Sequence, residues 1–101
     1  DIVVYSDEGL RWRDLSTGEG GLIDEGGDFA AAAPTFAVYH RFEEEDEGRY
    51  EIVARGYEGD YEQTLLTQAD APWLAAPISV ARTRVAFLAG GFLHVFQWEP
   101  R

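Results

Sequence analysis

The chain is predicted to be all-β, built from short antiparallel strands. Three observations predict this class: apolar and polar residues alternate with a period of two, glycine-rich turns separate the alternating segments, and helical periodicity is nearly absent. The one helix-prone stretch, residues 29–33, places four alanines after Phe29. It stops at Pro34, and a segment this short does not form a stable helix.

The expected strands follow one another as hairpins. Ile2–Tyr5 leads through the turn residues Ser-Asp-Glu-Gly into Leu10–Leu15. Because the connection is short, these two strands are expected to pair antiparallel. The same order recurs along the chain, with further strands expected at Phe36–His40, Arg49–Ala54, Tyr61–Thr67, Arg84–Leu88 and Phe92–Phe96.

The composition is that of one acidic domain. At 101 residues the chain suits a single domain with a modest core, and 46% hydrophobic residues are too many for a disordered chain. A net charge of −11 repels phosphate backbones, so no nucleic-acid partner is expected. The absence of cysteine excludes disulfides, thiolate metal sites and cysteine nucleophiles. No segment approaches the roughly 18 apolar residues of a membrane span.

A repeat divides the chain into units of about 1–35 and 36–80 and a partial unit of 81–101. Landmarks of the first two units recur after 41 to 44 residues: Gly18 and Gly59, Leu22 and Leu65, Phe29 and Trp73, and Pro34 and Pro77. Four strands in a repeat of about 40–45 residues are typical of β-propeller blades. The sequence therefore predicts one domain, 1–101, of antiparallel four-stranded, blade-like meanders.

The second unit resembles the TolB-like propeller repeat, a WD-repeat-like β-propeller family. Residues 37–53 match its apolar strand, its acidic hairpin with glycine, and its next strand, and residues 64–67 are similar to its third strand. Pro77-Ile78-Ser79 falls where the family has Pro-x-Trp-Ser-Pro-Asp-Gly, of which this chain lacks the Trp and the Asp-Gly. The resemblance implies an extracytoplasmic setting and protein partners, and such propellers also occur fused to peptidases.

Propellers close a ring of about four to eight blades, and repeat units bury their faces on one another. Two and a half units are fewer than such a ring needs. We expect either a compact pair of packed, blade-like sheets or a partial propeller completed by other chains. The first and last strands, Ile2–Tyr5 and Phe92–Trp98, would then offer open edges to a protein partner or to a second copy.

No catalytic, cofactor-binding or metal-binding residues are predicted. The acidic run Glu43–Glu47 is interpreted as a solvated hairpin tip, because consecutive carboxylates do not have the spacing of a calcium loop. His40 and His94 each border or interrupt an apolar strand, where a histidine with an ordinary hydrogen-bond partner is commoner than a zinc ligand. No Gly-x-Ser-x-Gly elbow or phosphate-binding glycine loop is present, so the chain is not expected to be an enzyme.

The candidate partner surface consists of Arg11, Trp12, Arg13 and Trp98. Tyr57 is a further aromatic residue considered together with the two tryptophans. The competing interpretation is that the tryptophans pack between sheets while the two arginines, on the opposite strand face, pair with carboxylates. We expect a non-catalytic protein-interaction or scaffold module. The alternatives are an accessory piece of a larger hydrolase or peptidase, and an acidic carbohydrate- or cation-binding domain.

Overall fold

The computed structural model describes residues 1–43, 49–58, 61–68 and 77–99. These residues form strands and turns without a helix, so the all-β prediction is confirmed. No helix in these ranges could therefore cross a membrane. The strands are β1 (Ile2–Ser6), β2 (Leu10–Asp14), β3 (Gly20–Asp24), β4 (Gly27–Ala32), β5 (Phe36–Glu43), β6 (Arg49–Gly56), β7 (Glu62–Gln68), β8 (Ile78–Ala81), β9 (Arg84–Ala89) and β10 (Phe92–Gln97).

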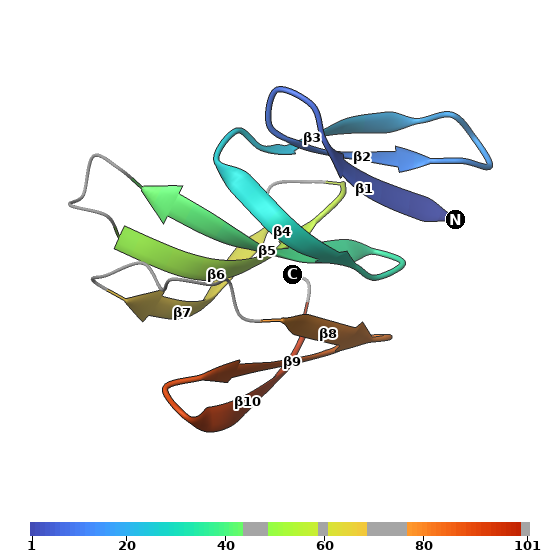
Figure 1. Cartoon of the computed structure of the whole chain (residues 1–101). Coiled ribbons are helices and arrows are strands. Elements are labelled where there is room, and N and C mark those ends of the chain that lie inside the picture. The colour runs from blue at the N-terminus through green and yellow to red at the C-terminus, as the bar shows by residue number, and fades with distance from the viewer. Residues whose placement is uncertain (44–48, 59–60, 69–76, 100–101) are drawn as a thin grey trace.

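The strands form three antiparallel meanders that lie one above another (Figure 1). The first sheet has the order β1-β2-β3, the central sheet β4-β5-β6-β7 and the third sheet β8-β9-β10. Two packed sheets were one expected arrangement, and three are found. The reason is that Ile78–Ala81 pairs with β9, so the last part of the chain builds a sheet of its own.

The boundary between the first and central sheets falls one strand earlier in the chain than the expected boundary between the repeat units 1–35 and 36–80. The alanine stretch lies in β4, which pairs with β5 through a tight turn closed by the Ala33 N–H donating to the Phe36 carbonyl at 2.8 Å. The pairing register shifts between Asp28 and Ala31, where Phe29 has a φ of 50°. This β-bulge leaves the Phe29 side chain 60% exposed.

The segment Ala89-Gly90-Gly91 joins β9 to β10. Ala89 pairs with Phe92, and the two residues between them, Gly90 and Gly91, have φ values of 60° and 81°. A two-residue turn of type I′ requires positive φ at both positions, which glycine adopts without a steric penalty. The turn chemistry therefore fixes this hairpin.

Both faces of the central sheet are covered. Phe36 and Val38 of β5 face the third sheet, and the intervening Ala37 and Tyr39 face the first; all four are fully buried. The cluster on the third-sheet side contains the buried residues Ala33, Phe36, Val38, Tyr50, Ile52, Ala54, Val85, Phe87 and Trp98. The cluster on the first-sheet side contains Leu10, Trp12, Ile23, Ala37, Tyr39 and Val53. Since burying one large apolar side chain contributes about 1.5–3 kcal/mol, these two layers hold the three sheets together.

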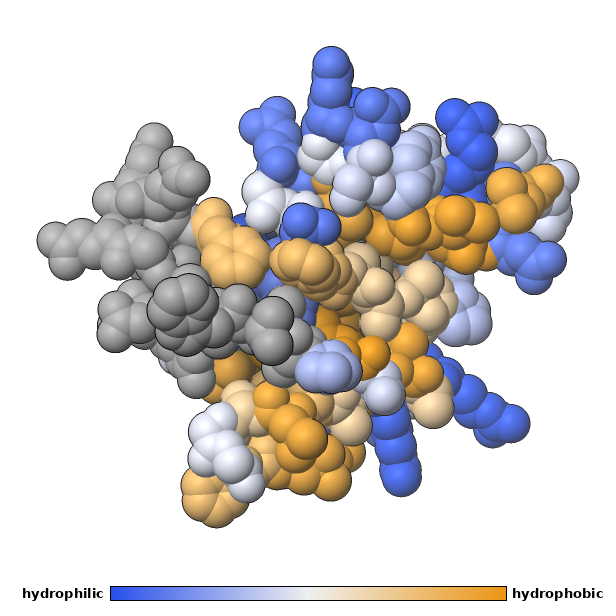
Figure 2. Space-filling view, in the orientation of Figure 1, coloured by the Kyte–Doolittle hydropathy of each residue, from blue (hydrophilic) through white to orange (hydrophobic). Residues whose placement is uncertain are grey.

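The outward face of the third sheet carries exposed apolar side chains, which no residue of the described ranges covers. Leu88 pairs with Leu93, and the two side chains are 60% and 66% exposed, while Val95 on the same face is 60% exposed. Figure 2 shows hydrophobic residues gathered over β9 and β10. The outward face of the first sheet differs, because it carries Arg11 and Arg13.

Gly27 of β4 gives a direct test of the packing between the first and central sheets. A Cβ at this position would lie 2.8 Å from the Tyr39 ring and 3.1 Å from Leu10 Cδ2, and both of these side chains are buried. We expect Gly27→Ala to lower the free energy of unfolding by about 2 kcal/mol through overpacking. Gly26→Ala is the matched control, because its nearest neighbours would lie at 3.8 Å or beyond. Equal urea midpoints for the two variants would contradict this packing.

Candidate functional site

A pocket of about 430 Å³ lies where one end of each of the three sheets meets. Its volume falls in the range of small-ligand and side-chain sites. The lining combines four aromatic side chains, three carboxylates and several small or apolar residues: Ile2, Trp12, Asp14, Glu19, Pro34, Thr35, Gly56, Tyr57, Glu58, Tyr61 and Trp98.

The register of the central sheet brings its lining segments together. Phe36 at the start of β5 pairs with Gly56 at the end of β6, so the segment before β5 and the segment after β6 share one end of the sheet. Two backbone hydrogen bonds fix these segments. The Tyr57 N–H donates to the Thr35 carbonyl at 3.2 Å, and the Gly56 N–H donates to the Tyr61 carbonyl at 3.3 Å.

The aromatic rings of the pocket connect all three sheets. The ring of Tyr57 lies 5.3 Å from that of Trp12 in the first sheet. The ring of Tyr61 lies 5.2 Å from that of Trp98, which follows β10 of the third sheet. Trp98 also stacks on Phe36, with centroids 4.7 Å apart. The pocket walls are therefore part of the packing that joins the sheets, and they are rigid for that reason.

Tyr57 is a neutral hydrogen-bond donor in this pocket. Its hydroxyl donates to the Ala33 carbonyl at 2.7 Å. Burial raises the pKa of Tyr57 to about 12, although the hydrogen bond to Ala33 acts in the opposite direction. The ring therefore contributes an uncharged, electron-rich surface at neutral pH.

The charged lining residues in the described part of the chain are all carboxylates: Asp14, Glu19 and Glu58. Asp14 accepts a hydrogen bond from the Ser16 N–H at 2.8 Å, which is the main cause of its lowered pKa, and its carboxylate lies 3.8 Å from the amino group of Asp1. Glu19 and Glu58 form no ion pair with any residue in the described ranges. The pocket is negatively charged.

Two nearly buried indole N–H groups remain without a partner. Trp12 and Trp98 are 9% and 4% exposed, and no acceptor among the residues described in the structure binds either N–H. Neither indole nitrogen is fully buried, because no fully buried side-chain nitrogen in those ranges lacks a partner. At Gly21, which pairs with Trp12, a Cβ would lie 3.3 Å from the indole nitrogen; glycine leaves that N–H uncovered.

The four residues of the expected partner surface separate into two groups. Trp12 and Trp98 lie together in the pocket. Arg11 and Arg13 lie on the opposite face of β2, away from it. Arg11 donates from Nε to the Asp7 carbonyl at 2.7 Å, and neither arginine forms an ion pair within the described part of the chain, so the expected carboxylate pairing is not found there.

Tyr61 and the three pocket carboxylates were not predicted as site residues. The sequence signal available for them was weak. Glu58 and Tyr61 flank a turn, where acidic residues are usually only solvated. Only the register of the central sheet places them beside Trp98.

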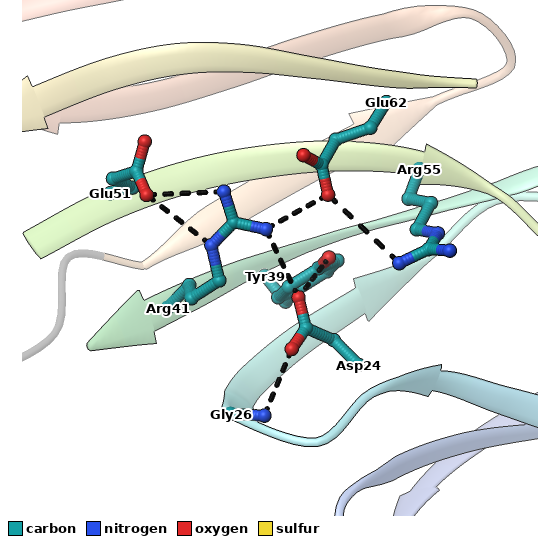
Figure 3. A network of polar contacts seen from close by, with 7 residues as sticks. All are labelled: Asp24, Gly26, Tyr39, Arg41, Glu51, Arg55 and Glu62. Atoms are coloured by element: carbon teal, nitrogen blue, oxygen red, sulfur yellow. Dashed lines mark hydrogen bonds and ion pairs between the residues drawn. The ribbon is translucent and has the colours of Figure 1, made fainter. Parts of the chain in front are cut away.

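A second polar cluster surrounds Arg41 on the first-sheet side of the central sheet (Figure 3). The guanidinium contacts three carboxylates: Glu62 at 2.8 Å, Glu51 at 3.1 Å and Asp24 at 3.2 Å. Asp24 comes from the end of β3, so the Arg41 cluster ties the first sheet to the central one. Its side chains are mutually satisfied, and the cluster is therefore a structural clamp.

The clamp shifts the pKa values of its members. Burial acts to raise the pKa of Asp24, but hydrogen bonds from the Gly26 N–H, the Tyr39 hydroxyl and Arg41 outweigh it and lower the pKa. Burial and the hydrogen bond to Asp24 raise the pKa of Tyr39. Burial also acts to lower the pKa of Arg41, whereas its bonds to Glu62, Glu51 and Asp24 raise it overall. Arg41 is thus positively charged throughout the ordinary pH range.

The two histidines lie in different sheets, each with a hydrogen-bond partner. His40 is fully buried, with Nδ1 2.5 Å from the Tyr50 hydroxyl. His94 Nε2 lies 3.2 Å from the Ala89 carbonyl. No group of three potential metal ligands occurs in the described ranges. Residues 44–47 of the acidic run lie outside those ranges.

No family model, curated protein or solved structure matches the chain. The resemblance to the TolB-like repeat therefore stays a prediction from the sequence.

The lowered pKa of Asp24 predicts acid sensitivity. A carboxylate whose pKa is lower in the folded chain than in the unfolded chain stabilises the fold. This contribution is complete above the pKa of the unfolded chain, about 3.9, and it is lost as the pH falls through the pKa of the folded chain. At pH 6 we expect Asp24→Asn to lower the free energy of unfolding by about 2 kcal/mol. The difference from the unsubstituted chain should shrink steadily below pH 4 in urea titrations.

Asp7→Asn is the control for this titration, because Asp7 is exposed. A difference between the unsubstituted chain and Asp24→Asn that stays constant from pH 6 to pH 2.5 would contradict the clamp.

Proposed function

We propose that this chain is a non-catalytic protein-interaction module whose partner inserts a peptide segment into the aromatic pocket. The observation that carries the proposal is the pair of nearly buried tryptophans whose indole N–H groups are open and unpartnered. Tryptophan and tyrosine in desolvated pockets dominate the binding energy of many protein interfaces. A preformed wall also lowers the entropic cost of binding, because few side chains need to be ordered.

The location of the pocket supports the same proposal. All three sheets contribute residues to it, so a partner at this position would contact one composite surface. The proposal needs no catalytic group, and it holds equally if the chain is an accessory part of a larger hydrolase.

Selection of peptides from a random displayed library tests the proposal. We expect selected peptides to shift the indole N–H resonances of Trp12 and Trp98 in the ¹⁵N-labelled chain. Thr35→Trp adds bulk at an exposed position on the pocket lining and should weaken binding about tenfold or more. Asp7→Trp adds the same bulk at an exposed position outside the pocket lining and should leave binding unchanged.

Two outcomes would refute the pocket as a peptide site. One is the recovery of peptides that leave both indole resonances in place. The other is a pocket whose resonances respond to a panel of neutral oligosaccharides and to no peptide, which would favour the carbohydrate-binding alternative.

Self-association is a second candidate, carried by the outward face of the third sheet. Leu88, Leu93 and Val95 are each at least 60% exposed there, and β10 is an edge strand with open backbone groups. Sedimentation velocity should show an average mass that rises with concentration. Leu93→Glu should return the chain to the monomer mass, and a monomer at every concentration would refute the candidate.

A further inference from the structure

We infer that the aromatic pocket selects a guanidinium group, the side chain of an arginine in the bound peptide. This inference rests on the proposed function and adds the chemistry of the ligand. It is carried by three features of the pocket that coincide: its charge, its flat aromatic walls and its open indole donors.

Charge complementarity is the first feature. Among the residues that the structure describes, three carboxylates and no basic side chain line the pocket. Of the three, Glu19 and Glu58 have no ionic partner within the described ranges. A cationic ligand would neutralise part of this negative charge and would be attracted by it. An anionic ligand is excluded for the same reason.

The partly exposed rings of Tyr57 and Tyr61 favour a flat cation, whereas the tryptophan rings behind them are nearly buried. Cations bind over the electron-rich faces of tryptophan and tyrosine, most often as the guanidinium of arginine. Guanidinium is planar, stacks on aromatic rings and is more weakly hydrated than the ammonium of lysine. Trp12 and Tyr57 lie 5.3 Å apart with an interplanar angle of 32°, and Tyr61 and Trp98 form a similar pair at 5.2 Å and 42°. Both tilted pairs and the three carboxylates belong to the lining of the same pocket.

The chain already binds one guanidinium with the same chemistry. Arg41 donates to the carboxylates of Asp24, Glu51 and Glu62 at 2.8–3.3 Å, and a tyrosine hydroxyl, that of Tyr39, shares Asp24. The pocket has the same kinds of groups, three carboxylates and two tyrosines, and no arginine among its described lining residues. Of the described groups, only the Asp1 amino group, 3.8 Å from Asp14, brings a positive charge close to these carboxylates.

The indole N–H groups explain why the guanidinium would arrive on a peptide. A guanidinium has only donors and leaves the N–H groups of Trp12 and Trp98 unsatisfied. A peptide supplies carbonyl oxygens next to its arginine, which can accept from these two donors. Free guanidinium is consequently expected to bind more weakly than an arginine peptide.

Matched probes test this inference on the ¹⁵N-labelled chain. We use acetyl-Gly-Arg-Gly-amide, its citrulline counterpart of nearly equal size and no charge, and guanidinium chloride against sodium chloride at equal ionic strength. We expect the arginine peptide to shift the Trp12 and Trp98 indole resonances with a Kd about tenfold below that of the citrulline peptide. Glu58→Gln should weaken the arginine peptide about threefold or more. Glu25→Gln, at an exposed position off the pocket lining, should not.

Each contrary outcome has a distinct meaning. Equal binding of the arginine and citrulline peptides would overturn the guanidinium inference and leave the peptide-binding function intact. Guanidinium chloride binding as tightly as the arginine peptide would overturn the role of the indole donors. If library-selected peptides also leave the indole resonances unmoved, the proposed function itself fails.

Discussion

The structure depends on the burial of both faces of the central sheet. Residues 36–40 in β5 are fully buried although successive side chains point in opposite directions, so two other surfaces must cover them. The first sheet covers one face through Leu10, Trp12 and Ile23, and the third sheet covers the other through Val85 and Phe87. Each outer sheet has three strands, and its buried apolar side chains pack against the central sheet. The three meanders are therefore one cooperative unit.

The stacking of the sheets also creates the candidate site. The aromatic side chains that close the layers at one end, Trp12 against Tyr57 and Trp98 against Tyr61, are the same ones that line the pocket. On the first-sheet side, the Arg41 cluster adds a polar contact between β3 and the central sheet. Binding in the pocket and stability of the layers are thus linked through shared residues. Substitutions of the pocket tryptophans would disturb both, whereas Thr35 and Glu58 at exposed positions separate the two effects.

The sequence predicts the local structure well because two-residue periodicity and glycine turns are local signals. The hairpins β1–β2 and β9–β10 follow from such signals. The number of sheets could not be predicted, because Ile78–Ala81 is four residues long and its assignment depends on pairing with β9. β4 is rich in alanine, which has little strand preference, and is a strand because β5 pairs with it. Trp12 and Trp98 were recognised as candidates, but only the packing of three sheets shows that they share one pocket.

Native-state hydrogen exchange measures the central claim most directly, because amides in the cooperative core open only with global unfolding. We expect the slowest amides to lie in β5 and β6, at residues such as Val38, Tyr39, Ile52 and Val53. Their opening free energies should equal the global free energy of unfolding. Slowest exchange in the first or third sheet, with β5 and β6 exchanging earlier, would contradict a core organised around the central sheet.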